Sequence, residues 1–246
     1  MRLTPAGEVV LRRGRRALSQ VEAIAADLQN LDQPGRAVIR VGVSQTSAAE
    51  IMPAALRRFH GEHPRTEVIL TEMSDDASAL AALVRGRLDL TFTYSAEPDE
   101  RVVFTPVMED PWVILLRDDD PAAELPDASF DILDGTDVVA WTRRWAAQVT
   151  LEDAWASLGI APRIVYRTDD NLALQRFVAA GLGRACVGRL VARRAVDSSL
   201  TWLLPRQQLA ERRIYLCTSR LSPPSPTAAG LVSAVLEQSR HSPPGA

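Results

Sequence analysis

Apolar side chains near the start of the chain recur with the spacing of a helix that packs along one stripe. Between about residues 5 and 31 they step by three and four positions, as in a heptad seam. Thr4 is placed to cap this helix, and Pro5 fits its first turn. A helix this long cannot bury the stripe against itself, so we expect the same helix of a second subunit to cover it. The expected dimerisation residues are Leu11, Leu18, Val21, Ala25 and Leu28.

After the break at Pro34 and Gly35 the period changes from that of a helix to that of alternating strands and helices. Short apolar runs with strand alternation are separated by amphipathic segments of helix length. This order is typical of a parallel sheet with helices on its faces. The expected strands are 38–43, 67–71, 88–94, 102–107 and 112–116, and the expected helices are 48–60 and 77–85.

Residues 117–137 form a break in composition, rich in acidic residues and proline. We expect this segment to be largely exposed and to carry the chain from one subdomain to a second. The second half then repeats the pattern of the first. Its expected strands are 137–141, 163–167, 183–187, 200–204 and 213–218, its expected helices are 146–158 and 171–180, and a last helix covers 227–239.

The predicted fold class is therefore α/β, with two Rossmann-like subdomains behind a long linker helix. The helix occupies residues 1–34 and the two-lobed domain residues 35–246. Subdomain I is expected over about 35–117 and 219–246, and subdomain II over about 118–218. Two such lobes predict a cleft, and small ligands bind in clefts at the carboxyl ends of the strands.

Four polar residues follow the first strand, and they are candidate ligand contacts: Ser44, Gln45, Thr46 and Ser47. Hydroxyl groups beside the N-terminus of a helix suit a carboxylate or a similar anion. The alternative is that Ser47 or Thr46 only caps the helix. Tyr94, at the end of the third strand, is a plausible wall residue of the same site.

Further candidates end the first strand and begin the second helix of the second lobe. Trp141 and Thr142 are expected to face the cleft, and Trp141 either stacks on a ligand or packs in the core. Asp169, Asp170 and Asn171 precede or open the next helix. Capping explains one of them, for which we favour Asp170, and we add Asn171 to the candidate ligand contacts.

Composition narrows the classes of function. The net charge is only −3, which argues against a chain that binds nucleic acid over its whole surface, and all 28 basic residues are arginine. No apolar run reaches the ~20 residues of a membrane span, and the N-terminus lacks the apolar core of a signal peptide, so we expect a cytoplasmic protein. Cys186 and Cys217 lie in apolar runs and are expected to be buried thiols.

The sequence shows no set of residues for catalysis, a metal or a cofactor. His60 and His63 have the spacing of a ligand pair but no nearby third ligand, and we interpret them as a solvated pair. Gly181 and Gly183 follow a helix and precede a strand, which is the reverse of the order in a nucleotide fingerprint. We expect no catalytic residue, no metal site, no cofactor, and no redox switch at the cysteines.

Six segments, taken in order, resemble the LysR-type transcriptional regulators. LTPAGE at residues 3–8 looks like the end of that family's winged helix-turn-helix. The others, which resemble its effector-binding domain, are RVGVSQTSAAEIMP at 40–53, FHGEHPRTEVIL at 59–70, LVRGRLDLTF at 83–92, FVAAGLGRACVG at 177–188 and SPTAAGLVSAVLEQ at 225–238.

This resemblance implies the two-lobed fold of periplasmic solute-binding proteins of type 2, with a small effector bound in the cleft. It implies a homodimer or homotetramer assembled through the linker helix, and contact with promoter DNA only through an N-terminal head that this chain lacks. Two segments depart from the family pattern: the usual HPLA is DPAA at 120–123, and the usual proline at the end of the segment 177–188 is Gly188. A stand-alone solute-binding protein is the main alternative, and an enzyme on the same scaffold is a third.

Overall fold

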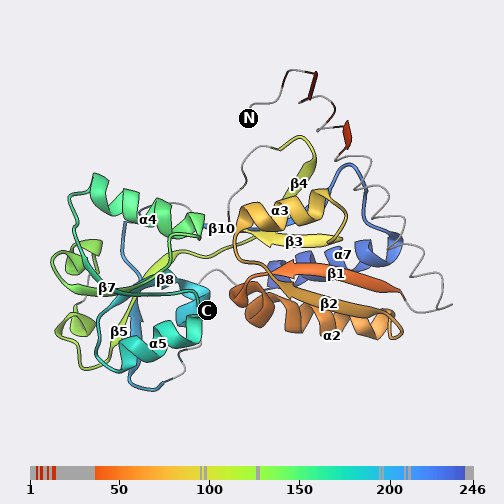
Figure 1. Ribbon diagram of the computed structural model, residues 1–246. Coiled ribbons are helices and arrows are strands. Elements are labelled where there is room, and N and C mark those ends of the chain that lie inside the picture. The colour runs from red at the N-terminus through yellow and green to blue at the C-terminus, as the bar shows by residue number, and fades with distance from the viewer. Residues whose placement is uncertain are drawn as a thin grey trace. The chain divides into compact units, whose positions relative to one another are not determined.

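The computed structural model describes residues 37–241, except 95, 97, 98, 126, 127, 194, 196, 208, 210 and 211, and isolated positions before residue 15. The residues expected to form the dimerisation seam, Leu11, Leu18, Val21, Ala25 and Leu28, lie outside this part. The described residues form two compact units, which Figure 1 displays as separate groups of strands and helices. No helix among them is both long and apolar enough to cross a membrane.

Unit 1 is built on a five-stranded sheet in the order β2-β1-β3-β10-β4. Strand β1 pairs in parallel with β2 and with β3, as the strand–helix alternation predicts. The apolar side chains of β1 and β3 are buried, as are Ala79, Ala82 and Leu83 of α3. The elements are β1 (Val38–Val43), α2 (Met52–Glu62), β2 (Glu67–Glu72), α3 (Asp76–Val84), β3 (Leu90–Thr93), β4 (Val102–Glu109), β10 (Arg213–Ser219) and α7 (Pro226–His241).

The helix after β1 begins with a wide turn. Residues Ser47–Ile51 form a π-helical turn, in which the Met52 N–H bonds to the Ser47 carbonyl oxygen. Pro53 follows directly, and a proline has no N–H to donate within a regular α-helix and crowds the carbonyl four residues earlier. The wide turn accommodates that proline, and such turns occur often at functional sites.

Unit 2 contains an antiparallel sheet in the order β8-β5-β9 and a parallel pair, β6-β7. A parallel bridge between Val138 and Arg184 joins β6 to the beginning of β8. Apolar side chains of the strands and of α4 and α5 form one buried cluster. The elements are β5 (Trp112–Arg117), β6 (Asp137–Trp141), α4 (Ala146–Ser157), β7 (Arg163–Thr168), α5 (Asn171–Ala179), β8 (Ala185–Gly188), α6 (Arg189–Ala192) and β9 (Leu200–Leu203).

The order of strands and helices expected from the sequence is confirmed between β1 and α7. Residues 117–137 contain many exposed positions, as expected, but the crossing between the units does not lie in this segment. The chain passes from unit 1 to unit 2 after Thr105, inside β4, and returns to unit 1 after Tyr215, inside β10. Strand β5 therefore belongs to unit 2, because it pairs with β8 and β9.

The acidic segment after β5 also packs within unit 2. It contains two short 3-10 helices, Pro121–Glu124 and Phe130–Leu133, that the sequence did not predict. Phe130 and Leu133 are buried in the core of unit 2, and Asp131 between them is exposed. Because the segment is mostly acidic, its sequence did not indicate that these two apolar residues are buried.

A buried ion pair ties the two crossing strands together at their unit 2 ends. Asp110 follows β4, Arg212 precedes β10, and the Arg212 guanidinium donates to one oxygen of the Asp110 carboxylate. The side chains are 0% and 5% exposed. A Cβ atom added at Gly188 would overlap the bonded nitrogen and oxygen of this pair and lie 2.7 Å from the Arg212 Cζ. Gly188 therefore provides the space that the ion pair occupies.

We expect Gly188→Ala to destabilise unit 2 by ~3–5 kcal/mol, the range for breaking a buried ion pair. All five tryptophans lie between residues 106 and 215, so tryptophan fluorescence during urea unfolding reports on unit 2. In a chain that already carries Asp110→Ala and Arg212→Ala, both side chains that the new Cβ would overlap are absent, and the same alanine is expected to add little. An equal cost in both backgrounds would show that Gly188 does not act through the pair.

Candidate functional site

The carboxyl end of β1 in unit 1 brings Ser44, Ser47 and Tyr94 together. The Ser47 N–H donates to the Ser44 Oγ at 3.2 Å, and the Ser44 N–H donates to the Ser47 Oγ at 2.9 Å. The Ser44 and Tyr94 hydroxyl oxygens lie 2.7 Å apart, and Tyr94 directly follows β3. Two neighbouring parallel strands therefore place these hydroxyl groups at one edge of the sheet.

The cap of this helix is Ser44, and not Ser47 or Thr46 as the capping alternative proposed. The bonds between Ser44 and Ser47 run in both directions, as in a capping box, with a serine hydroxyl in the usual place of a glutamate. Thr46 has helical dihedral angles and makes no capping bond with its side chain. Ser47 is 0% exposed and is enclosed by its own turn, whereas Ser44 is 9% exposed.

Gln45 lies at the exposed side of the same turn. Its side-chain amide donates to the Glu72 carboxylate at 3.1 Å, and Glu72 ends the neighbouring strand β2. Thr46 is 6% exposed. The polar edge of unit 1 therefore offers hydroxyl groups from Ser44 and Tyr94 and an amide from Gln45.

The carboxyl ends of β6 and β7 in unit 2 bring together Trp141, Thr142 and Asn171. The Trp141 indole N–H donates to the Asn171 side-chain oxygen at 2.9 Å. The Trp141 ring is 6% exposed and lies 6.2 Å from the ring of Trp112. Of the two alternatives for Trp141, the structure therefore places its ring in the core, where it orients Asn171 at the start of α5.

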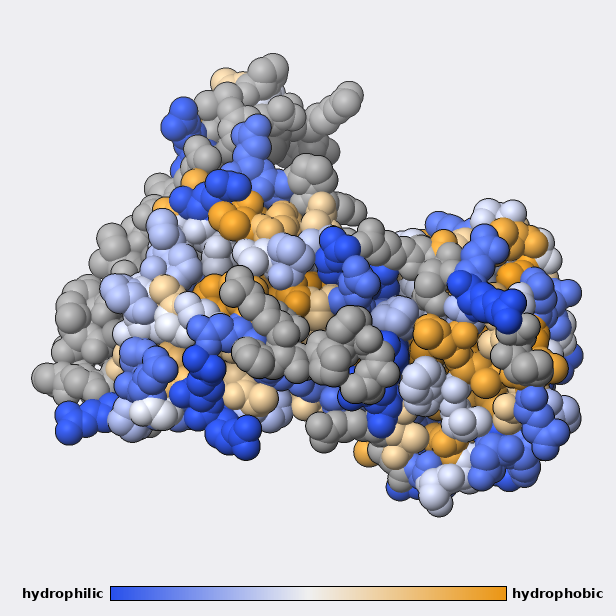
Figure 2. Space-filling view, turned by 180° about the vertical axis from the view of Figure 1, so that it is seen from behind, coloured by the Kyte–Doolittle hydropathy of each residue, from blue (hydrophilic) through white to orange (hydrophobic). Residues whose placement is uncertain are grey.

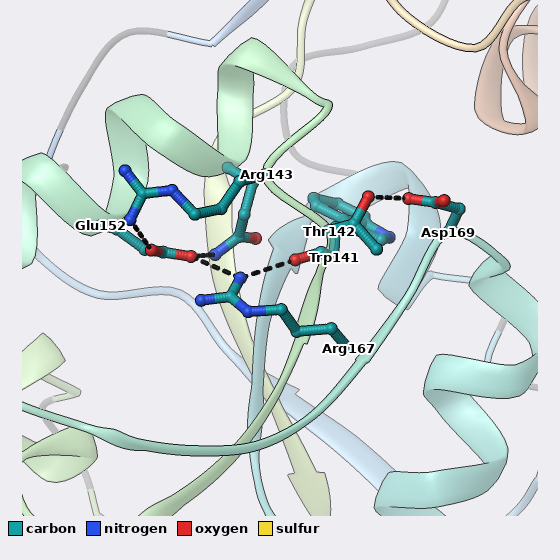
Figure 3. A network of polar contacts seen from close by, with 7 residues as sticks. Trp141, Thr142, Arg143, Glu152, Arg167 and Asp169 are labelled. Atoms are coloured by element: carbon teal, nitrogen blue, oxygen red, sulfur yellow. Dashed lines mark hydrogen bonds and ion pairs between the residues drawn. The ribbon is translucent and has the colours of Figure 1, made fainter.

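Thr142 belongs to a polar network that spans the ends of both strands (Figure 3). Its hydroxyl group donates to the Asp169 carboxylate, and Arg144 donates to the other oxygen of the same carboxylate. Asp170 caps α5, as expected, through an acceptor bond from the Ala173 N–H at 2.9 Å. Asp170 thus caps the helix, and the Asp169 carboxylate is bonded by Thr142 and Arg144 instead.

The second half of the network surrounds Glu152 of α4. Arg143 and Arg167 each donate to one of its carboxylate oxygens, at 3.0 and 2.7 Å, and Gln148 donates at 2.9 Å (Figure 3). Arg167 also donates to the carbonyl oxygen of Trp141 at 2.9 Å. Arg143 and Arg167 therefore link the end of β6 to Glu152 of α4, whereas Gln148 supports Glu152 from within α4.

Both acids in this network stay ionised near neutral pH. Partial burial raises the pKa of Glu152. Hydrogen bonds from Arg167 and Gln148 and the two nearby guanidinium charges lower it by more than burial raises it, so the pKa lies below its usual value. Burial likewise raises the pKa of Asp169, and the bonds from Thr142 and Arg144 more than offset this effect. The network therefore stays charged across the physiological range.

Sequence reasoning missed the arginines of this network. Arg143 and Arg144 directly follow the predicted strand end, and Arg167 ends the next one, so their positions were the available signal. What the sequence could not show is that Glu152, nine or more residues away along the chain, neutralises two of them.

The comparisons with known proteins agree with this architecture. Residues 32–240 match the family described as the LysR substrate binding domain. The regulator CysB of Haemophilus influenzae is 25% identical over 203 residues, which cover 80% of this chain and 61% of CysB. A probable hydrogen peroxide-inducible genes activator of Streptomyces viridosporus is 33% identical over 113 residues, covering 46% of this chain and 36% of the activator.

The regulatory domain of CcmR from Synechocystis PCC6803, solved in complex with 2-PG, superposes with a TM-score of 0.75. It is 18% identical, and the match covers 84% of this chain and 99% of that domain, so it supports the fold alone. The chain spans about 60% of the length of CysB. The family match covers most of the chain, and the protein belongs to the LysR family of transcriptional regulators, of which it carries the effector-binding domain.

Proposed function

We propose that the full-length protein is a DNA-binding transcription regulator whose activity is set by a small effector. The effector-binding domain, with polar groups gathered at strand ends in each unit, supports this proposal. The proposed contacts are Ser44, Gln45, Thr46 and Tyr94 at the edge of unit 1, and Thr142 and Asn171 at the edge of unit 2. Ser47 and Trp141 then act in support of the site, because each is bonded within its own unit.

In this proposal the protein works in the cytoplasm as a homodimer or homotetramer, assembled through a helix over residues 1–34. It binds promoter DNA only through a head upstream of that helix, and it catalyses no reaction. A stand-alone solute-binding protein is the second candidate, because the two-lobed effector-binding fold resembles that of such proteins.

Light scattering coupled to size exclusion separates the two candidates. A regulator is expected to elute as a dimer or larger species, and Leu18→Asp with Leu28→Asp is expected to shift it toward monomer, because both charges would fall on the predicted seam. The matched control, Gln20→Asp with Asn30→Asp, adds the same two charges off the seam. A strict monomer, with no promoter fragment bound in gel-shift assays once a head is fused upstream, would contradict the regulator.

We expect Ser44→Ala and Thr142→Val each to reduce the thermal shift caused by the effector. Loss of one hydrogen bond, at ~1 kcal/mol, corresponds to about fivefold weaker binding. A metabolite screen by thermal shift identifies the ligand, and each variant is compared with its own unliganded melting temperature, because Ser44→Ala also removes a helix cap. Ser157→Ala and Thr150→Val, at exposed positions of α4, serve as controls. Unchanged shifts in both site variants would contradict the site.

A peroxide-sensing role receives no support from the cysteines. Burial raises the pKa of Cys186 well above its usual value, and Cys217 is 0% exposed beside the Thr93 hydroxyl group. A thiol held protonated and enclosed reacts slowly, because the thiolate is the reactive form.

We therefore expect Cys186 and Cys217 to resist a disulfide reagent such as DTNB in the folded protein at neutral pH and to react after unfolding in urea. Prior exposure to hydrogen peroxide is expected to leave both thiols titratable. Loss of one thiol equivalent after peroxide treatment of the folded protein would contradict this expectation. Cys186→Ser and Cys217→Ser identify which thiol is lost.

A further inference from the structure

The turn that follows β8 is held by hydrogen bonds from two successive backbone N–H groups, those of Arg189 and Leu190. The Arg189 N–H donates to the Pro111 carbonyl oxygen at 2.9 Å. The next N–H, that of Leu190, donates to the buried Asp110 carboxylate at 2.9 Å. Because the same carboxylate is bonded to Arg212, the backbone at Arg189 is fixed to the core of unit 2.

Arg189 differs from the other arginines near the carboxyl ends of the unit 2 strands. Arg143, Arg144, Arg167 and Arg212 each bond to a carboxylate. The Arg189 Nε is buried and has no hydrogen-bond acceptor, and no ion pair joins its guanidinium to an acid among the residues that the structure describes. An unsatisfied buried polar group is costly, and more so when it is charged, so it calls for an acceptor.

Strand pairing places Arg189 at the same edge of unit 2 as Thr142. The parallel bridge joins Val138 of β6 to Arg184 of β8, and the Val139 N–H donates to the Arg184 carbonyl oxygen at 2.8 Å. Continuing this register along both strands brings Gly188 level with Thr142. A second contact agrees, because Trp112, which pairs with Gly188, lies 6.2 Å from the ring of Trp141.

We infer that Arg189 receives an anionic group of the effector, an inference that rests on the proposed site at the strand ends of unit 2. A guanidinium group binds carboxylate and phosphate oxygens through paired donors, and it keeps its charge at any physiological pH. Arg189 is partly exposed, so a ligand can reach it, and its backbone is fixed before the ligand arrives. The effector is accordingly a small carboxylate or phosphate, and Arg189 selects it over its neutral analogues.

The first test follows the Arg189 Nε–H resonance in protein labelled with 15N-arginine, with the resonance assigned from its absence in Arg189→Lys. The probes are inorganic phosphate, benzoate and the metabolites that the thermal-shift screen returns, and benzamide is the neutral counterpart of benzoate. We expect at least one anion to shift this resonance at millimolar concentrations and benzamide to leave it in place. No shift with any of these anions would overturn the inference.

The second test compares Arg189→Gln with Arg193→Gln. Arg193 is the exposed residue that directly follows α6, so the control removes the same charge from the same short segment. For the anion that shifts the resonance, Arg189→Gln is expected to weaken binding about tenfold to hundredfold, the effect of losing ~1.5–3 kcal/mol of charged hydrogen bonds. Arg189→Lys is expected to recover part of the affinity, and Arg193→Gln to bind as the parent does.

The outcomes separate this inference from the proposed function. If Thr142→Val weakens binding of the anion and Arg189→Gln does not, the site stands and the role of Arg189 is overturned. The same holds if the ligands found are neutral and depend on Thr142 alone. If no variant at Ser44, Thr142 or Arg189 changes binding of any ligand found, both the proposed site and this inference fail.

Discussion

Unit 2 depends on a carboxylate–guanidinium pair that is sealed from water. Asp110 and Arg212 are 102 positions apart along the chain, and together they close the two strands that join the units. Withdrawing both charges from water is expensive, and their attraction repays this cost only when the remaining polar atoms also find partners. The second oxygen of Asp110 does so through the Leu190 N–H, and the Asp110 N–H donates to the Arg212 carbonyl oxygen at 2.9 Å.

The Asp110–Arg212 pair also contacts the aromatic residues that pack beside the candidate site in unit 2. The Arg212 guanidinium lies 5.1 Å from the centroid of Trp112 and 5.8 Å from that of Trp141, within the range of a cation–π contact. Trp141 in turn bonds to Asn171 at the start of α5. A change at the ends of β4 or β10 therefore meets the same packed cluster that positions Asn171. On the face of the molecule that Figure 2 shows, hydrophilic and hydrophobic residues are intermingled.

Much of the fold could be predicted because burial of the strands leaves a strong pattern. Burial alternates over the first four residues of β1, β5 is apolar and buried up to Arg117, and both strands fall where the sequence placed them. Local chemistry was also readable at the start of α5, where Asp170 was expected to cap and does. These features depend on residues close together in the sequence, so the spacing of apolar and polar residues along the chain is enough to predict them.

Features that depend on distant partners were not predictable in this way. The sequence does not say which of the serines after β1 serves the helix cap, because that choice depends on the wide turn required by Pro53 and on the approach of Tyr94 from β3. Nor does it say that Glu152 neutralises Arg143 and Arg167, while Arg189 has no acid partner among the residues that the structure describes. In the segment 117–137 the acidic composition did not reveal that Phe130 and Leu133 are buried in the core of unit 2 and hold the segment there.

The two departures from the family pattern each coincide with an ion pair, and this changes how they are interpreted. Asp120, in place of the usual histidine, accepts two bonds of 2.8 Å from Arg184. Gly188, in place of the usual proline, leaves the space that Arg212 and Asp110 fill. Asp120 or Arg184 without its partner would leave a charge that is largely withdrawn from water, and a larger side chain at Gly188 would displace the Asp110–Arg212 pair. Gly188 directly precedes Arg189, so the part of unit 2 proposed to meet the effector is also a part where this chain differs from the family pattern. Its effector therefore has to be identified by measurement on this protein and cannot be inferred from relatives.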